Sequence, residues 1–433
     1  MGAWHTAGRA AIVALATIPF TASGETLEDA WRAALAADGR LGAAEARTAA
    51  SDAALSAARA ERYPRVTATT ATSHWRDPPA FDFGAAGSPS VLPLFGGDTM
   101  NLATAQVELP LYTGGALTAN LEAAAAAHDG QGLEANALRQ DLKLGVAEAY
   151  VGVLRAASGL TVARSNSASL AAHARDVEDM RNTGQVPTND YLAAAVSLAD
   201  ARQRELMAQG ALELAYALYN RRVGRPLDTP VAVEPLDEPL GGAAITAPRA
   251  ELVAAARAAR PELAELDAAA LALVARTAGA RAARRPQLAL RGGYAYLENE
   301  VLSREHFWFV SLGVRVNVFD SGRSRHASTA LERQSAAVAD DRRDRAAEIE
   351  LEVHRAWQDL ATARARVDVV VSAVQQAEEN LRVVRDRYRN GEGTNTEVLD
   401  AEALRALSAS NFDTARYDVR LAELRLTRAV GAL

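Results

Sequence analysis

One stretch near the end of the chain occurs twice, and this repetition constrains the fold more than any other feature. Residues 388–400 read Tyr-Arg-Asn-Gly-Glu-Gly-Thr-Asn-Thr-Glu-Val-Leu-Asp, and residues 180–192 have a similar pattern. Gly391 lies 207 residues after Gly184 (391 − 184 = 207). The same offset relates Ala149-Tyr150 to Ala356-Trp357, Leu192 to Leu399, and Val223-Gly224 to Val430-Gly431. The chain is therefore a tandem duplication.

The repeated stretch has the residues of a turn between two helices. Asn390-Gly391-Glu392-Gly393 is helix-breaking, and the spacing of Thr394 and Glu397 is that of a capping box. We therefore expect helical hairpins with tips at 182–190 and 389–397.

Two very long helices are predicted to lead into these tips, over about 115–183 and 322–390. In the second, apolar or small residues recur every three or four positions from Ile349 to Tyr388, which is a heptad seam. Subtracting 207 gives a matching seam from Leu142 to Val177. At 1.5 Å per residue each helix would be roughly 100 Å long, and it must pack against other helices.

Four strands are predicted, at about 65–76, 101–112, 287–297 and 307–319. In the last, Val310, Leu312 and Val314, followed by Val316 and Val318, alternate with polar or small residues. The loop between the first two strands is about fifteen residues longer than its counterpart, because the offset between copies falls from 222 to 207 across it. Helices are predicted at 26–62, with a possible break near Asp38-Gly39, and at 248–284, where Pro261 takes the place of Gly39.

Residues 1 to about 24 resemble a secretory signal peptide, with Arg9 before a short apolar run and small residues Thr21 to Gly24. The alternative is the apolar start of a buried helix. The run is too short to span a bilayer, and no other stretch approaches the required length. We therefore expect repeat 1 over 25–224, a Pro-rich equatorial linker over 225–248, and repeat 2 over 249–433.

Composition excludes several classes of site. The chain has no cysteine, which rules out disulfides, thiolate metal sites and a lipidated N-terminal cysteine. Its formal charge of −7 argues against a nucleic-acid partner. The seven histidines lack metal-ligand spacing, and no nucleophile, base and orienting acid can be assembled, so neither an enzyme nor a cofactor is expected. The charge run around Asp340 to Glu352 is interpreted as a solvated helix face with i,i+4 pairs.

Strands with one apolar face, in a secreted chain, predict an α+β membrane protein whose sheet closes into a barrel. Four strands cannot close a barrel, but three chains would supply twelve. Aromatic residues at the strand ends, including Trp75, Tyr296 and His306 to Phe309, suit an interfacial girdle. The alternative for these aromatics is ordinary sheet packing in a soluble protein.

The chain resembles the TolC-type outer-membrane efflux proteins over nearly its whole mature length. The resemblance is carried by the duplicated strand-pair and long-hairpin plan, the tip Tyr388 to Ala401, and the C-terminal Val430-Gly431. It is also carried by the strand ends Leu109-Pro110-Leu111-Tyr112 with Gly114-Gly115, and Val316 to Gly322.

The resemblance implies a homotrimer with a twelve-stranded barrel in the outer membrane, continued by a long helical barrel in the periplasm. It implies a periplasmic adaptor and an inner-membrane transporter of the RND, ABC or MFS type as partners, with Gly184 and Gly391 at the adaptor docking turns. Such a chain is the duct of a tripartite efflux pump or, alternatively, of a type I protein secretion system. A soluble periplasmic coiled-coil scaffold is a more distant alternative.

The resemblance also assigns residues to the periplasmic entrance. Glu397 and Asp400 match acidic positions that ring it, and their i,i+3 spacing puts both on one helix face. The alternative is two solvated acids favoured by a helix N-terminus. Tyr388 and Asp190 match positions of closed-state tip contacts. Gly393 stands where related chains carry an arginine.

Overall fold

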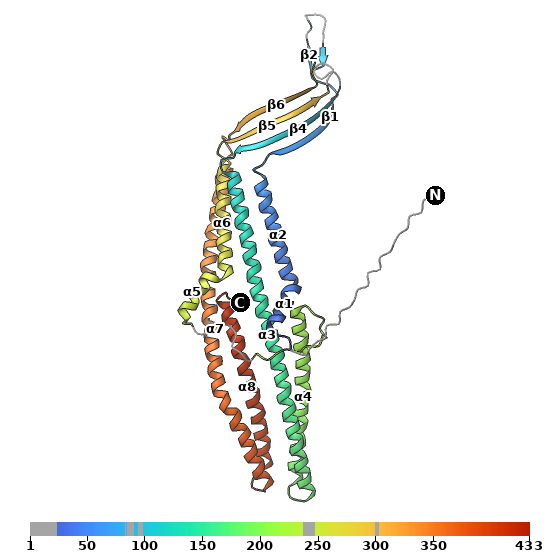
Figure 1. The fold of residues 1–433 in the computed structure, drawn as a ribbon, viewed down its shortest axis with the longest axis vertical. Helices are drawn as coiled ribbons and strands as arrows, with labels where there is room; N and C mark the ends of the chain where they lie inside the picture. Colours follow the sequence, from blue (N-terminus) through green and yellow to red (C-terminus); the bar gives the residue numbers. More distant parts are fainter. Residues whose placement is uncertain (1–23, 83, 85–90, 94–97, 237–246, 299–302) are drawn as a thin grey trace, which may run out of the picture.

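The computed structural model describes residues 24–82, 84, 91–93, 98–236, 247–298 and 303–433. The expected signal peptide lies outside these residues. The molecule is a long rod with a curved sheet at one end and two helical hairpin tips at the other (Figure 1).

The two halves share one order of elements. The first half contains α1 (Leu27–Ala37), α2 (Gly39–Ala60), β1 (Arg65–His74), β4 (Thr99–Tyr112), α3 (Ala116–Asn182) and α4 (Thr188–Val223). The second contains α5 (Arg249–Ala259), α6 (Pro261–Ala282), β5 (Gln287–Leu297), β6 (His306–Arg315), α7 (Arg323–Arg389) and α8 (Asn395–Ala429). The long first-half loop was predicted without strands, but it holds a short hairpin of β2 (Ala80–Asp82) and β3 (Val91–Pro93).

The main sheet is antiparallel throughout, in the order β1-β4-β5-β6. Its register brings apolar residues onto one face, as in the pairs Leu290↔Leu312 and Tyr294↔Trp308. The prediction of a strand as far as residue 319 is wrong, since β6 ends at Arg315. Arg315 pairs with Gln287, the first residue of β5, and Pro286 before it has no N–H to continue the ladder.

The helix breaks lie where they were expected. Asp38 caps α2, because its Oδ1 accepts hydrogen bonds from the backbone N–H groups of Arg40 and Leu41, at 2.8 and 3.0 Å. Pro261 is the first residue of α6. Each break meets the end of a helix that returns from a tip: Gly224 after α4 lies against Ala37, and Gly431 after α8 lies against Ala259. The repeated Val-Gly pair thus marks the two joints at the middle of the rod.

The heptad seams form the core of the rod. Buried residues of the α3 seam include Leu142, Val146 and Val177, and those of the α7 seam include Ile349 and Leu381. The middle of the α7 seam is only half-buried, at Val367, Val370 and Val374. Of the described helices, α3 alone is apolar and long enough to cross a membrane by length and composition, which the sequence analysis did not anticipate. It packs lengthwise against α4 and α6 in the rod.

The interpretation of the acidic α7 stretch as a solvated face is wrong in part. Glu350 binds Arg257 of α5 at 2.7 Å, and Glu352 binds the buried Arg260 at 2.8 Å. Within α7, the pair Arg345–Glu348 has i,i+3 spacing, not i,i+4. Glu350 and Glu352 therefore join α7 to the end of α5 and to Arg260 at the start of α6, while their side chains stay 52% and 39% exposed.

Candidate functional site at the hairpin tips

Both tips end their long helix in the same way. In tip 1 (residues 183–187) the N–H of Gln185 donates to the carbonyl of Met180 at 2.9 Å, and in tip 2 (residues 390–394) the N–H of Glu392 donates to Arg387 at 2.8 Å. Gly184 and Gly391 both have φ of +75°, in the left-handed region that glycine adopts without strain. No atom lies within 4 Å of a Cβ built on either glycine, so both backbones are open to a partner.

Glu397 and Asp400 lie on the first turns of α8 with exposed side chains. Glu397 completes a capping box: its Oε2 accepts from the Thr394 N–H at 3.1 Å, while its own N–H donates to Thr394 Oγ1 at 3.3 Å. Gly393 lies directly beneath this carboxylate, since a Cβ there would be 3.1 Å from Glu397 Oε2 and 3.2 Å from Tyr388 N. A Cβ at 393 would require the Glu397 carboxylate and the backbone at Tyr388 to move by a few tenths of an ångström.

Tyr388 lies inside the tip, 4% exposed, with its ring 5.5 Å from that of His173. Burial and the nearby Asp190 carboxylate raise the pKa of the Tyr388 hydroxyl. The structure brings the two predicted gate residues near each other within one chain, but the hydroxyl of Tyr388 has no hydrogen-bond partner among the described residues.

A hydrogen-bonded link joins the two hairpins beside Tyr388. His173 Nε2 of α3 is 2.8 Å from Asn395 Oδ1 of α8, and Asn395 Nδ2 donates to the carbonyl of Asp190 on α4 at 3.0 Å. Burial lowers the pKa of His173, because desolvation disfavours the charged imidazolium. We call this set the hairpin link. No pattern in the sequence predicted it.

A second missed contact lies on the sheet side of the hairpin link. The fully buried Glu402 of α8 forms an ion pair with Arg385 of α7 and accepts a hydrogen bond from Ser169 Oγ of α3 at 2.8 Å. The position of Glu402 in the first repeat is occupied by Ala195 (402 − 207 = 195). That difference between the copies is the one sequence signal that could have revealed the contact.

The described residues contain no group of three or more His, Cys, Asp or Glu side chains placed to hold a metal ion. The exposed chemistry at the tips is therefore that of open glycines and exposed carboxylates. It suits contacts with a partner and with ions in solution.

An open antiparallel sheet with an apolar face, set on a rod of paired helical hairpins, defines a TolC-type outer-membrane channel. The chain belongs to the outer membrane efflux protein family, whose family model matches residues 31–219 and 252–432. It is an outer-membrane efflux channel that extends into the periplasm, and not an enzyme.

Solved structures show the same fold at low sequence identity. The chain is similar to the outer-membrane channel OprN (19% identity, TM-score 0.78, covering 94% of this chain and 90% of that one). It is similar to VceC of Vibrio cholerae (17% identity, TM-score 0.79, covering 94% of this chain and 96% of that one). It is also similar to the open state of MtrE of Neisseria gonorrhoeae (18% identity, TM-score 0.72, covering 94% of this chain and 88% of that one).

Among curated proteins, the outer membrane efflux protein BepC of Brucella suis biovar 1 (strain 1330) is 28% identical over 156 residues. That match covers 36% of this chain and 34% of BepC. The chain therefore aligns with about a third of that relative's length.

Proposed function

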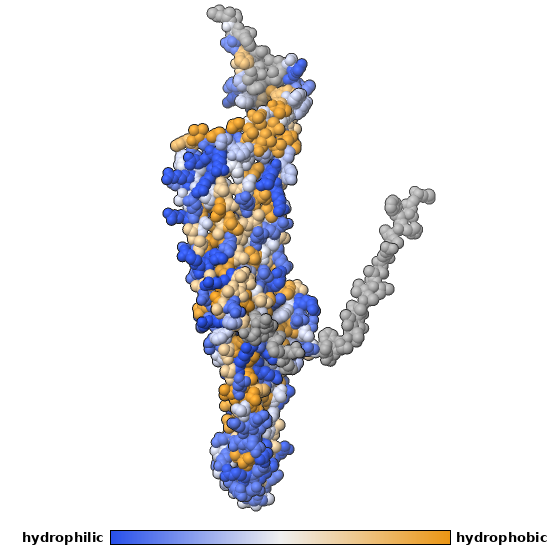
Figure 2. Space-filling view, turned by 60° about the vertical axis from the view of Figure 1, so that its left-hand side comes forward, coloured by the Kyte–Doolittle hydropathy of each residue, from blue (hydrophilic) through white to orange (hydrophobic). Residues whose placement is uncertain are grey.

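We propose that the chain is the outer-membrane duct of a tripartite efflux pump, exporting small molecules or ions. The single observation that supports this most is the sheet. Its apolar face is bare in one chain, with Trp308 77%, Val66 70% and Val314 68% exposed. Figure 2 shows apolar surface gathered over the strands, and hydrophilic surface over the opposite tip. A face of this kind is stable against lipid and not against water.

The sheet also has two free edges, β1 and β6. Lipid cannot satisfy the N–H and C=O groups of an open edge, so β1 must pair with β6 of a neighbouring copy. Three copies would close twelve strands, and their helices would continue the barrel as a tube. α4 carries exposed apolar residues along its length that suit burial against the next copy, namely Leu192, Val196, Met207, Leu214 and Leu218.

At the other end of the tube the tips would meet the rest of the pump. Gly184 and Gly391 would receive a periplasmic adaptor, because both are open and neither has a side chain to block a second backbone. Glu397 and Asp400 would place six carboxylates around the threefold axis. Such a ring attracts cations into a narrow entrance.

Measurement of export in the source organism tests the proposal. Deletion of the gene should raise the steady-state accumulation of a fluorescent efflux dye in intact cells, and the plasmid-borne gene should restore it. Unchanged accumulation together with loss of a secreted protein from the medium would contradict the pump and assign the duct to type I secretion.

A further inference from the structure

The polar face of the sheet is strongly basic at the end nearest the helices. The register places Arg65 of β1 opposite Glu108 of β4, and Glu108 opposite Arg291 of β5. In β6, Ser311 is opposite Arg291, and Arg315, the last residue of the strand, lies four positions further on, so it points to the same face as Ser311. Side chains of equal parity point to one face, so all four charges share the face opposite Val66, Leu312 and Val314.

Only one of the three arginines is neutralised. Arg291 binds Glu108, with Nη2 3.1 Å from Oε1. Arg65 and Arg315 are exposed and form no hydrogen bond or ion pair with any residue in the described part of the chain. Three arginines against one glutamate leave a formal charge of +2 per chain on the strand residues of this face.

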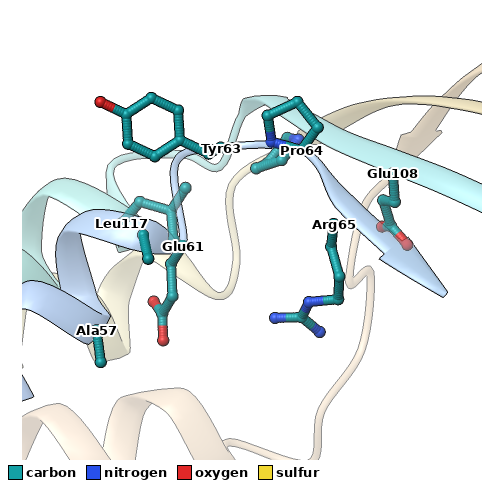
Figure 3. Close-up of a pocket in the computed structure, with 9 residues that line it drawn as sticks. Ala57, Glu61, Tyr63, Pro64, Arg65, Glu108 and Leu117 are labelled. Carbon is teal, nitrogen blue, oxygen red and sulfur yellow. The ribbon is translucent and has the colours of Figure 1, made fainter.

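The surface is hollowed beside these charges. One cavity of about 620 Å³ lies at the junction of α2 and β1, and Figure 3 shows Arg65 and Glu108 extending to the same side of it. A second, of about 250 Å³, is lined by Glu108, Arg291, Gln287 and Arg315. Glu61 also lines the first cavity, so Arg65 shares that space with two carboxylates. The second cavity has Arg291 and Arg315 against Glu108 alone, so it is the one with a net positive lining that can admit a small anion.

Closure of the sheet by neighbouring copies would bring the two unpaired arginines together. β1 begins and β6 ends at the helix side, and these are the two free edges. Pairing β1 with a neighbour's β6 therefore puts Arg65 of one copy and Arg315 of the next at the same end of one junction. Like charges across a strand pair repel, and an anion between them would relieve that repulsion.

We propose that Arg65 and Arg315, supported by the Arg291–Glu108 pair, form an anion-binding belt inside the periplasmic end of the barrel. This inference rests on the proposed closure of the sheet into a trimeric duct. The belt binds phosphate, sulfate or carboxylate groups of dissolved solutes, because the polar face of the sheet faces the lumen. Its sign is opposite to that of the Glu397 and Asp400 ring at the far end of the tube.

Block of single-channel current by tripolyphosphate tests the belt. The purified protein is inserted into planar bilayers of zwitterionic phosphatidylcholine, which offer no anionic headgroups, and tripolyphosphate is added on the barrel side. Wild-type current should be blocked, and Arg315→Gln or Arg65→Gln should weaken the block roughly tenfold, the size expected for loss of a charge-assisted hydrogen bond. Arg315→Lys should keep most of the block.

Arg76→Gln is the matched control, since it removes the same charge just beyond the other end of β1 and should leave the block unchanged. Normal conductance with a block unaffected by Arg65→Gln and Arg315→Gln would overturn the belt and leave the duct standing. If tripolyphosphate blocks only when anionic lipid is present, the arginines serve lipid headgroups and the belt is refuted. Absence of any conductance would refute both the duct and the belt.

Discussion

His173 and Asn395 face each other across the joint between the two hairpins, with His173 Nε2 2.8 Å from Asn395 Oδ1. They lie 222 residues apart, one in each repeat. Asn395 also holds the backbone of Asp190, so one amide side chain ties α3, α8 and α4 together. Both residues are buried, and a buried hydrogen bond that loses one partner costs about 1–3 kcal/mol.

The hairpin link should weaken in acid. The pKa of His173 is lowered by burial and by Arg385, which outweigh the opposing effects of the Asn395 hydrogen bond, Glu402 and Asp176. Below the ordinary histidine pKa of about 6.5 the unfolded or opened segment binds a proton that the closed joint does not, so stability falls as pH falls. Amide exchange in residues 170–177 and 395–402, corrected for intrinsic rates, should report more opening at pH 5.5 than at pH 7.5.

His173→Gln is the variant that checks the cause. It keeps an amide that can bond Asn395 but removes the titrating ring, so the pH dependence of exchange should disappear. An equal pH dependence in this variant would show that another group is responsible.

Arg385→Ala should destabilise the tip region strongly. It strips the nearer of two ion-pair partners from Glu402, whose side chain is 1% exposed, and leaves only Arg405, 3.6 Å away. Breaking a buried ion pair costs up to about 3–5 kcal/mol. Arg382→Ala is the matched control on the same helix. Arg382 pairs with Glu379 and Asp386 in the open, where water and salt screen such pairs and they contribute little to stability. Thermal unfolding in detergent should separate the two variants, and equal losses would contradict a buried role for Glu402.

Gly224→Ala should disrupt the joint in the middle of the rod. The residue has φ of +76°, and an added Cβ would overlap Ala37 Cβ. The variant should lose about 1 kcal/mol of stability from backbone strain and a further cost of about 1–3 kcal/mol from overpacking against Ala37. Gly184→Ala has nearly the same φ with open space around it, so it should show the strain alone. If both variants lose equal stability in thermal melts, the close contact with Ala37 is not what requires glycine.

Joint replacement Glu397→Gln and Asp400→Asn should reduce the preference for cations. Reversal potentials in a KCl gradient should move toward zero, and block by divalent cations should weaken, since a carboxylate ring concentrates cations at the entrance. Glu378→Gln on the exposed side of α7 removes one carboxylate charge per chain away from the tips and should change neither quantity. Unaltered selectivity in the double variant would leave these acids as helix-capping residues only.

Much of the fold could be predicted because it depends on local period and on repetition. The heptad seam from Ile349 to Tyr388 and the alternation of Val310, Leu312 and Val314 each specify an element without knowledge of its partners. The end of β6 could not be predicted this way. The alternation continues to Val318, but the ladder stops at Arg315 because β5 begins at Gln287.

The tip was predicted in part for a similar reason. Gly184, Gly391 and the Thr394–Glu397 box are local turn signals, and the structure shows each in place. In the sequence, nothing distinguishes Glu402, Arg385 and His173 from ordinary residues on a helix surface. Their environment depends on contacts between the two hairpins, such as His173–Asn395 and Ser169–Glu402, which join residues more than 200 positions apart. No single-helix pattern carries that information.

The mass of the detergent-extracted protein, measured by native mass spectrometry, tests the central claim most directly. The free edges of β1 and β6 and the bare apolar face of the sheet require neighbouring copies and lipid. We expect a particle of three chains that needs detergent to stay in solution. A monomer that remains soluble without detergent would contradict the account.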